Sequence, residues 1–254
     1  MSTVSKKIEY PTSDGKPMAE TEVHRIVMVD SIAKLSEFYA QTPDVHVSGN
    51  LLIFYVEGDK RIHVSPDVFV VKGVDKRLRR YFMTWEEGKG PDLVIEITSK
   101  STKNEDLRKK FLLYQDVLGV SEYFLFDPFA EYIKPQLKGY RSVESVYQPI
   151  EPVEGRLPSE VTGLHLEARA TELDFFDPAT QAYRKTPEVM AQERAEVERA
   201  GRLKEQAARQ RAEDAVAVER ALREKSEAEL ATLLAELARL RGGSNGPDTN
   251  GQAG

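Results

Sequence analysis

The sequence of 254 residues contains no cysteine, so disulfide bonds, thiolate metal ligands and cysteine nucleophiles are excluded. It has no run of about eighteen apolar residues, which excludes a membrane-spanning helix. The first residues, MSTVSKKIEYPTSDG, lack the apolar segment of a secretory signal, and a cytoplasmic protein is expected. The formal net charge of −6 argues against a protein that coats nucleic acid through bulk charge, but it is compatible with a local basic groove.

Several familiar site motifs are also missing. There is no glycine-rich phosphate loop, no Gly-x-Ser-x-Gly nucleophile elbow and no dinucleotide fingerprint. The histidines are scattered without the spacing of metal ligands, and each is expected to be structural: His24, His46, His63 and His165. Any chemistry is therefore expected from carboxylates and lysines.

The composition changes sharply at Thr186-Pro187-Glu188. From Glu188 to Arg241 there are eleven Lys/Arg and twelve Asp/Glu, and no proline follows Pro187 until Pro247. Thr186 as N-cap and Pro187 at the first helical position predict a helix start, and Gly242-Gly243 predicts its end. We expect three parts: a folded domain over 1–186, a charged helix over 187–241 and a disordered tail over 242–254.

Four leucines near the end of this helix follow 3-4-3 spacing: Leu230, Leu233, Leu237 and Leu240. Such spacing is typical of a short coiled-coil seam and offers a route to a homodimer. Nearer the start of the helix the seam gives way to alanines, so a solvated single helix is equally compatible with the pattern.

Within residues 1–186 the apolar pattern predicts a helix from about Glu20 to Tyr39. Further elements follow in order: strands Leu51–Glu57 and Ile62–Val71 joined at Gly58-Asp59, a strand Asp92–Thr98, a helix begun by the capping box Thr102–Glu105 and ended at Gly119, and a strand Tyr123–Phe126. Residues 129–186 are expected to form a β-rich meander at the edge. The expected fold is α/β (α+β), with a mixed sheet and the order helix–three strands–helix–strand.

Glu96 is the first candidate for chemistry because it lies inside the apolar strand LVIEI. A buried carboxylate without a partner costs several kcal/mol, so it must be protonated, paired with a cation or bound to a metal. Strand alternation puts Asp92, Val94, Glu96 and Thr98 on one side. A site and a polar structural network both remain open.

Asp67 follows Pro66 near the middle of the strand Ile62–Val71, where a bend could direct its carboxylate into a cleft. A turn aspartate is the alternative. If the two strands pair, Asp67 and Glu96 approach a common cation, and hard oxygen ligands favour Mg²⁺ or Mn²⁺. On the following helix, Lys103, Asp106 and Lys110 share a face, so Lys110 completes the constellation unless it simply faces solvent.

At these residues the chain resembles the Uma-two family of restriction endonucleases, within the PD-(D/E)XK nuclease superfamily. The resemblance covers about residues 10–180 and depends on the segments YPTSDGKPMAE, VSPDVFVV and WEEGKGPDLVIEITS. It continues through EDLRKKFLLYQDVLGVSEYFLFDP, where five residues match the family's pattern: Asp106, Lys110, Tyr114, Gly119 and Asp127. The resemblance implies a restriction-endonuclease-like core with helices flanking a mixed sheet.

The resemblance also implies a metal-dependent phosphodiesterase site. Asp67 matches the acid of the Pro-Asp element and Glu96 that of the Glu-x-Lys element, and the carbonyl of Ile97 is expected to face the metal. Thr98 stands where that element has lysine, and Lys110 is expected to supply the ammonium group instead. Accessory candidates are Glu20 or Glu22 on the first helix, and Asp92, Thr98 and Asp106.

The implied function is a DNA endonuclease that hydrolyses phosphodiesters with a metal-activated water. Basic residues are expected to contact the DNA backbone, although a solvated basic loop is equally compatible: Lys72, Lys76, Arg77, Arg79, Arg80, Lys100 and Lys103. The alternative is a catalytically inactive nuclease-like module for DNA binding or assembly. A purely structural protein would need a hydrogen-bonding partner for Glu96.

Overall fold

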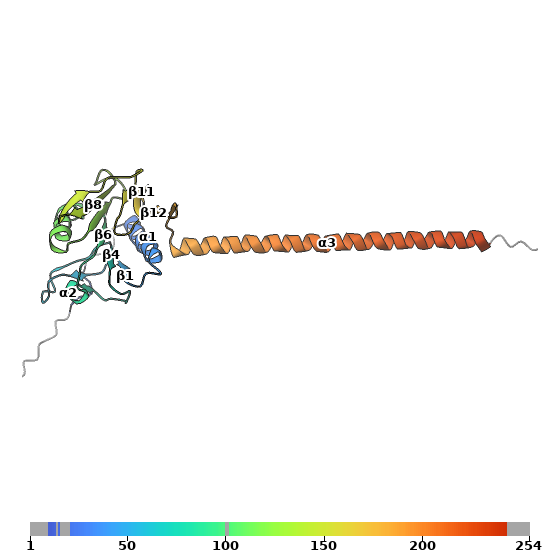
Figure 1. The fold of residues 1–254 in the computed structure, drawn as a ribbon, viewed down its shortest axis with the longest axis horizontal. Coiled ribbons are helices and arrows are strands. Elements are labelled where there is room, and N and C mark those ends of the chain that lie inside the picture. The colour runs from blue at the N-terminus through green and yellow to red at the C-terminus, as the bar shows by residue number, and fades with distance from the viewer. Residues whose placement is uncertain (1–9, 14, 16–20, 100–101, 243–254) are drawn as a thin grey trace, which may run out of the picture. The chain divides into compact units, whose positions relative to one another are not determined.

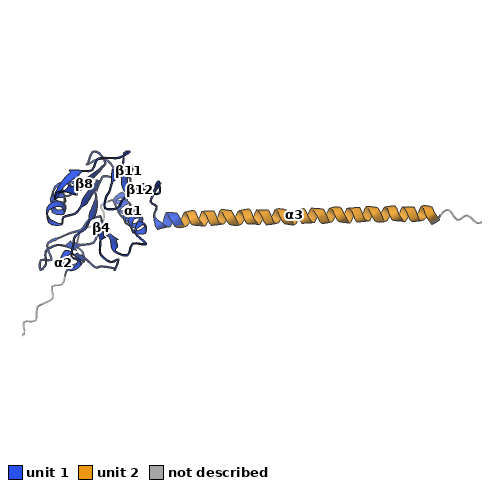
Figure 2. Ribbon diagram, in the orientation of Figure 1, with its two compact units in different colours: residues 1–190 blue, residues 191–254 orange. Residues whose placement is uncertain are grey.

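The computed structural model describes residues 10–13, 15, 21–99 and 102–242. Two compact units comprise residues 1–190 and 191–254 (Figure 2). The first unit contains every strand of the described residues, and the second continues the helix α3, Pro187–Gly242. The candidate acids therefore belong to the first unit.

A six-stranded mixed sheet forms the centre of the first unit. Its strands in spatial order are β1 (Val45–Ser48), β4 (Val68–Lys72), β6 (Leu93–Ile97), β7 (Glu122–Phe126), β8 (Leu137–Val143) and β9 (Val146–Pro149). Only β6 and β7 pair in parallel; the other neighbours are antiparallel. All residues of β6 and β7 are buried, as expected for strands covered on both faces.

Helices cover the two faces of this sheet (Figure 1). On one face, α1 (Glu22–Phe38) packs Val27 and Leu35 with the strand residues Val70 and Ile95. On the other face lies the connection between β6 and β7, which contains the wide helical segments η1 (Glu105–Lys110) and η2 (Leu113–Val117). A parallel pair of strands needs a crossover connection, and here the chain runs from the end of β6 into this helix. The start of the helix therefore lies near the end of β6.

Two smaller sheets and a short helix complete the unit. One sheet contains β10 (Leu157–Pro158), β11 (His165–Arg169), β12 (Glu172–Asp177) and β13 (Ala182–Tyr183). Its strand β12 joins α1 through a buried ion pair of 2.8 Å between Lys34 Nζ and Asp174 Oδ1. The other sheet contains β3 (His63–Val64), β2 (Ile53–Phe54) and β5 (Phe82–Met83), followed by α2 (Thr84–Glu87).

The expected fold class is confirmed, because α1, β1, β4, β6, the η1–η2 helix and β7 follow the order helix–three strands–helix–strand. The identity of the first strand was wrong: it is β1, whereas Leu51–Glu57 contributes only β2, which pairs with β3 in a separate sheet. The expected strand Ile62–Val71 is divided at Pro66, since proline has no N–H to donate to a ladder. Residues 129–186 extend the central sheet through β8 and β9 and also build the β10–β13 sheet.

The capping box expected at the second helix is absent. The Thr102 hydroxyl accepts a 3.1 Å hydrogen bond from the N–H of Ser99, before the helix, instead of capping the residues after it. Within the helix, the Leu118 N–H reaches the carbonyl of Leu113, five residues back, at 3.0 Å. This i→i+5 bonding makes the helix wider than an α-helix.

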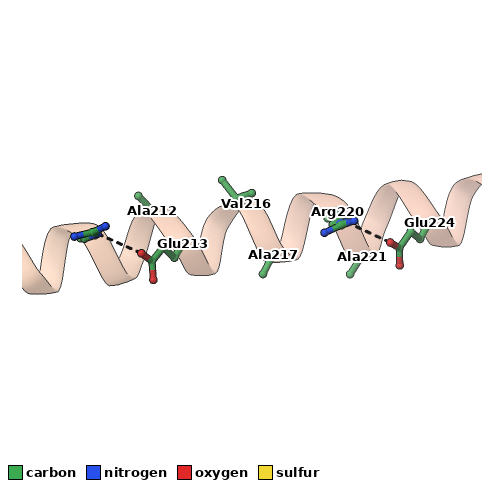
Figure 3. Close-up of a pocket in the computed structure, with 8 residues that line it drawn as sticks. Ala212, Glu213, Val216, Ala217, Arg220, Ala221 and Glu224 are labelled. Atoms are coloured by element: carbon green, nitrogen blue, oxygen red, sulfur yellow. Dashed lines mark ion pairs between the residues drawn. The ribbon is translucent and has the colours of Figure 1, made fainter.

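In α3, Thr186 Oγ1 accepts from the N–H of Val189 at 3.4 Å, as expected of an N-cap. Every residue from 191 to 241 is exposed. Ion pairs four residues apart follow the helix surface, including Arg209–Glu213 at 3.4 Å and Arg220–Glu224 at 3.5 Å (dashed lines in Figure 3). Of the expected tail, 242–254, Gly242 is instead the last residue of α3, and residues 243–254 lie outside the described residues. In the described part of the chain, no helix combines the length and apolar character needed to cross a membrane.

Candidate active site

Asp67 and Glu96 meet at neighbouring strand ends. Strands β4 and β6 are antiparallel, with Val68 opposite Ile95. Asp67 comes directly before Val68 in the chain, and Glu96 comes directly after Ile95, so both acids adjoin the last pair of this ladder. Two acids that are 29 positions apart in the sequence therefore lie at one end of adjacent strands.

The Asp67 carboxylate is held by groups from two other elements. Its Oδ2 accepts a 2.8 Å hydrogen bond from the N–H of Ile97, and its Oδ1 lies 3.1 Å from Nε2 of His24 on α1. The N–H and C=O of a strand residue point to the same side, so the Ile97 carbonyl also faces Asp67. That this carbonyl would also face a bound metal stays a prediction.

Gly49 allows the backbone at Asp67 to occupy its position. A Cβ added at Gly49, just after β1, would lie 2.0 Å from the carbonyl oxygen of Asp67 and 2.6 Å from Cδ1 of Ile32. The next residue, Asn50, donates its N–H to the Pro66 carbonyl at 2.8 Å. Only glycine fits this close approach, which has no signal in the local sequence.

Glu96 has two partners, both from the helix that follows β6. Its exposed fraction is 1%; Oε2 lies 2.8 Å from Nζ of Lys110, and Oε1 accepts a 2.6 Å hydrogen bond from the Tyr114 hydroxyl. Lys110 Nζ also lies 3.1 Å from Oδ1 of the buried Asp106. The structure thus brings Glu96, Lys110 and Asp106 together, as expected, and it identifies Tyr114 as the hydrogen-bonding partner of Glu96 that the purely structural alternative needs.

The wide turns of η1 and η2 explain how one helix supplies these groups. Asp106, Lys110 and Tyr114 are four residues apart in sequence. A helix closed by i→i+5 bonds has more residues per turn than an α-helix. Side chains four positions apart therefore lie on nearly the same side of this helix. Such π-helical turns are frequent at functional sites.

The cluster has more buried negative than positive charge. Burial raises the pKa of Glu96 to about 8, with contributions from Asp67 and Asp106, although Lys110 opposes the shift. Burial also raises the pKa of Asp106. Burial lowers the pKa of Lys110, but its attraction to Glu96 and Asp106 outweighs this and holds its pKa above the usual value. The ammonium group of Lys110 thus contacts two buried acids with a third, Asp67, nearby, and the arrangement favours uptake of a proton or of a further cation.

The oxygen donors gathered here would fill only part of the coordination shell of a hard divalent cation, so they fit such an ion in a site that leaves positions open. Among residues 10–13, 15, 21–99 and 102–242, no three His, Cys, Asp or Glu side chains form a ready metal cluster. Asp67, Glu96 and the Ile97 carbonyl offer oxygen ligands, which suit Mg²⁺ or Mn²⁺ when water or phosphate completes the coordination. The excess of buried carboxylate is the observation that supports this fit.

The structure places the accessory candidates at different distances from the two acids along the fold. Thr98 is buried beside Ile97, with 2% of its surface exposed. Asp92 lies at the opposite end of β6, where it accepts from the Lys72 N–H at 2.6 Å and pairs with Lys89 at 2.7 Å, so the structure does not bring it to the site. Glu22 has a side chain 79% exposed and lies 3.9 Å from Arg25. Glu20 lies outside the described residues.

Most of the basic residues expected to contact DNA lie far from the acids, because the loop after Lys72 leaves β4 at the end opposite Asp67. Arg77 and Arg79 are bound to Glu87 at 2.6 and 2.8 Å, and only 3% of the Arg79 side chain is exposed, so these two guanidinium groups serve the loop's own structure. Lys76 donates to the carbonyls of Tyr39 and Ala40.

Among the remaining basic candidates, Arg80 is exposed on the same loop as Arg77, and Lys100 lies outside the described residues. Lys103 is beside the site, with Nζ 5.3 Å from the centre of the Tyr132 ring. Its backbone N–H donates to the carbonyl of Ser99 at 3.1 Å, just after the end of β6.

His24 is the residue that sequence reasoning missed, since it was expected to be purely structural. Its backbone N–H is capped by Thr21 Oγ1 at 3.1 Å, which places the imidazole in the first turn of α1. The helix N-cap is visible in the sequence, but the contact with Asp67 joins residues 43 positions apart and has no local signal.

The fold is restriction-endonuclease-like: a mixed sheet between helices, with acids at neighbouring strand ends. The chain belongs to the Uma2 family, described as "Putative restriction endonuclease", whose model matches residues 4–172. A solved structure from Anabaena variabilis, described as "a putative nuclease belonging to DUF820", is similar with 18% identity and a TM-score of 0.44. That match covers 61% of this chain and 83% of the other. No match was found among curated proteins.

Proposed function

We propose that this protein is an endonuclease that hydrolyses phosphodiester bonds of DNA with the help of Mg²⁺ or Mn²⁺. The observation that carries the proposal is the convergence of Asp67 and Glu96 at adjacent strand ends, with the Lys110 ammonium group 2.8 Å from Glu96. Membership of the Uma2 family supports nuclease chemistry in general. The metal and the DNA substrate are the specific parts of the proposal.

Asp67, Glu96 and the Ile97 carbonyl would hold the cation. When bound, a divalent cation lowers the pKa of a water molecule and stabilises negative charge on the phosphate. The N–H of Ile97 and the imidazole of His24 orient the Asp67 carboxylate. Asp106 holds Lys110 next to Glu96, where its ammonium group can also support a phosphate oxygen.

The test is cleavage of plasmid and single-stranded DNA in Mg²⁺, Mn²⁺ or EDTA. Glu96→Gln and Asp67→Asn should each reduce cleavage at least about 100-fold, because the contribution of a metal is worth several kcal/mol. Glu22→Gln, an exposed carboxylate on α1, is the matched control and should cleave normally. Cleavage that persists in EDTA, or in both site variants, would contradict the proposal.

Metal binding supplies a measurement that does not depend on turnover. Calorimetric titration with Mn²⁺ should show binding by the wild type and by Glu22→Gln. Asp67→Asn should largely abolish it, because the variant removes one of the two acidic ligands. Equal binding by Asp67→Asn would remove Asp67 from the proposed site.

We also propose that α3 pairs with the α3 of a second copy of the chain. The leucines at 3-4-3 spacing are 53–74% exposed: Leu230, Leu233, Leu237 and Leu240. An apolar stripe of this kind is covered when two such helices pack together. A dimer would provide two sites, which suits cleavage of both DNA strands.

A further inference from the structure

A small pocket adjoins the candidate site. Its volume is about 210 Å³, and its lining includes His24 and Ile97, the two residues that contact Asp67. Its other walls come from the end of β6, at Thr98 and Ser99, and from the loop after β7, at Phe129, Glu131 and Tyr132. A group bound in the pocket would therefore lie next to the Asp67 carboxylate.

The lining combines flat apolar surfaces with polar groups. Phe129 and Tyr132 present aromatic rings, and 48% of Phe129 is exposed, so its ring is accessible. Thr98 is 2% exposed, and its Oγ1 has no hydrogen-bond partner among the described residues. A buried hydroxyl of this kind needs a ligand or water to satisfy it. Aromatic rings beside hydrogen-bonding groups are the means by which proteins bind single nucleobases.

The loop that supplies the aromatic rings is fixed in place. Asp127, fully buried at the end of β7, accepts hydrogen bonds from the backbone N–H groups of Phe129 at 3.1 Å and Ile133 at 3.0 Å, and also from that of Tyr132. Bonds to a buried carboxylate hold this loop in one conformation before any ligand binds. The pocket is thus preorganised.

Size limits what the pocket can accept. Its volume is below the range of about 300–1,000 Å³ that is typical of sites for drug-sized ligands, so it suits one ring system. A base within a duplex is stacked and paired, and it reaches such a pocket only after leaving the helix. Lys103, 5.3 Å from the Tyr132 ring, provides a positive charge for the backbone of a strand that enters there.

We propose that this pocket binds one unpaired nucleobase next to the cleaved phosphate, so that the preferred substrate is DNA with single-stranded character at the cut. This inference rests on the proposed nuclease function for the position of the phosphate. The binding of the base itself is a separate property, and it is measurable without cleavage.

The test uses the full chain in EDTA and two oligonucleotides of one sequence that contain 2-aminopurine, either paired in a duplex or in a one-base bulge. The bulged oligonucleotide should bind more tightly, and its fluorescence should be quenched by stacking on Phe129. Phe129→Ala should weaken binding of the bulge about 5- to 150-fold, the range for one base–aromatic stack. It should leave duplex binding unchanged.

A second variant and a control distinguish a loss of base binding from misfolding of the protein. Thr98→Val keeps the side-chain shape and should weaken bulge binding about 2- to 10-fold through one lost hydrogen bond. Val143→Ala, at an apolar side chain 50% exposed at the end of β8, should bind like the wild type. Equal affinity for the two oligonucleotides, no binding of either, or no loss in Phe129→Ala overturns the inference.

Cleavage of the same oligonucleotides in Mg²⁺ separates this inference from the proposed function. Cleavage of the bulged and duplex oligonucleotides at equal rates would contradict base binding by the pocket, but it would support the proposed nuclease function. Selective quenching by the bulge without any cleavage would support base binding and contradict the nuclease.

Discussion

The hydroxyl of Tyr114 donates a 2.6 Å hydrogen bond to Oε1 of Glu96. Tyr114 is completely buried, and Glu96 is 1% exposed. Lys110 binds the other oxygen of Glu96 at 2.8 Å, so the orientation of this carboxylate is fixed by two residues of a single helix. Each of these contacts has a measurable consequence.

Tyr114→Phe should lower the free energy of unfolding by about 1–3 kcal/mol, the usual cost of leaving a buried acceptor without its hydrogen-bonding partner. The ring still fills its place in the core, so the loss reports on the hydroxyl alone. Urea denaturation measures it. Tyr140→Phe, at a partly buried tyrosine, is the control and should change stability by less than about 0.5 kcal/mol. An equal effect of both variants would mean that the bond to Glu96 is unimportant.

Glu96 should make stability fall as pH rises. Burial raises its pKa from 4.5 to about 8, so between these values the folded state keeps a proton that the unfolded state has lost. The free energy of unfolding therefore falls with pH, by up to about 1.4 kcal/mol per pH unit for one proton.

Burial lowers the pKa of His46 from 6.5 to about 4, so His46 has the opposite effect below pH 6.5. The informative window for Glu96 is thus pH 6.5 to 8. Urea denaturation in EDTA across that window should show the decline, and Glu96→Gln should flatten it. A decline of the same slope in the variant would assign it to another group.

Lys110→Met should destabilise the fold by about 3–5 kcal/mol, because it leaves Glu96 and Asp106 buried without their cation. The double variant Lys110→Met/Glu96→Gln should regain much of this loss, since it replaces one of the two buried acids that have lost their cation. A double-mutant cycle from chemical denaturation measures the coupling between the two residues. Strictly additive losses would show that the ion pair contributes no net stability.

Gly49→Ala should disturb Asp67 specifically. The new Cβ would lie 2.0 Å from the Asp67 carbonyl oxygen, so the backbone there must shift. We expect Mn²⁺ affinity and cleavage to fall at least about 10-fold, since a displacement of about 1 Å at a site can cost 100-fold. Gly201→Ala, at a glycine of α3 with nothing within 4 Å of an added Cβ, should leave both unchanged. Normal Mn²⁺ binding by a folded Gly49→Ala protein would contradict this role.

The leucine stripe of α3 should control self-association. Leu233→Glu combined with Leu237→Glu places charges on the proposed contact and should convert a dimer to a monomer in analytical ultracentrifugation. Leu203→Glu, which replaces an exposed leucine of the same helix outside the 3-4-3 set, is the control. A monomeric wild type at micromolar concentration would contradict the dimer.

Much of the fold was predictable because its signals are local. The apolar run around Glu96, the helix that contains Lys110 and the N-cap at Thr186 each depend on neighbouring residues. β1 was missed because four residues beside a turn have little periodicity of their own. The wide turns of η1 and η2 were not predicted either, since the spacing of apolar residues fits an α-helix equally well.

The sequence by itself determined that two acids and a lysine lie on or beside two strands and the following helix of a mixed α/β fold. It did so because the pattern of apolar side chains that must be buried determines where strands and helices form. Only the tertiary structure decided the contacts between distant segments: His24 with Asp67, Gly49 beneath Asp67, and the basic loop at the far end of β4. These contacts depend on strand register and on helix placement, which arise when the whole core packs. A local sequence pattern therefore does not predict these contacts.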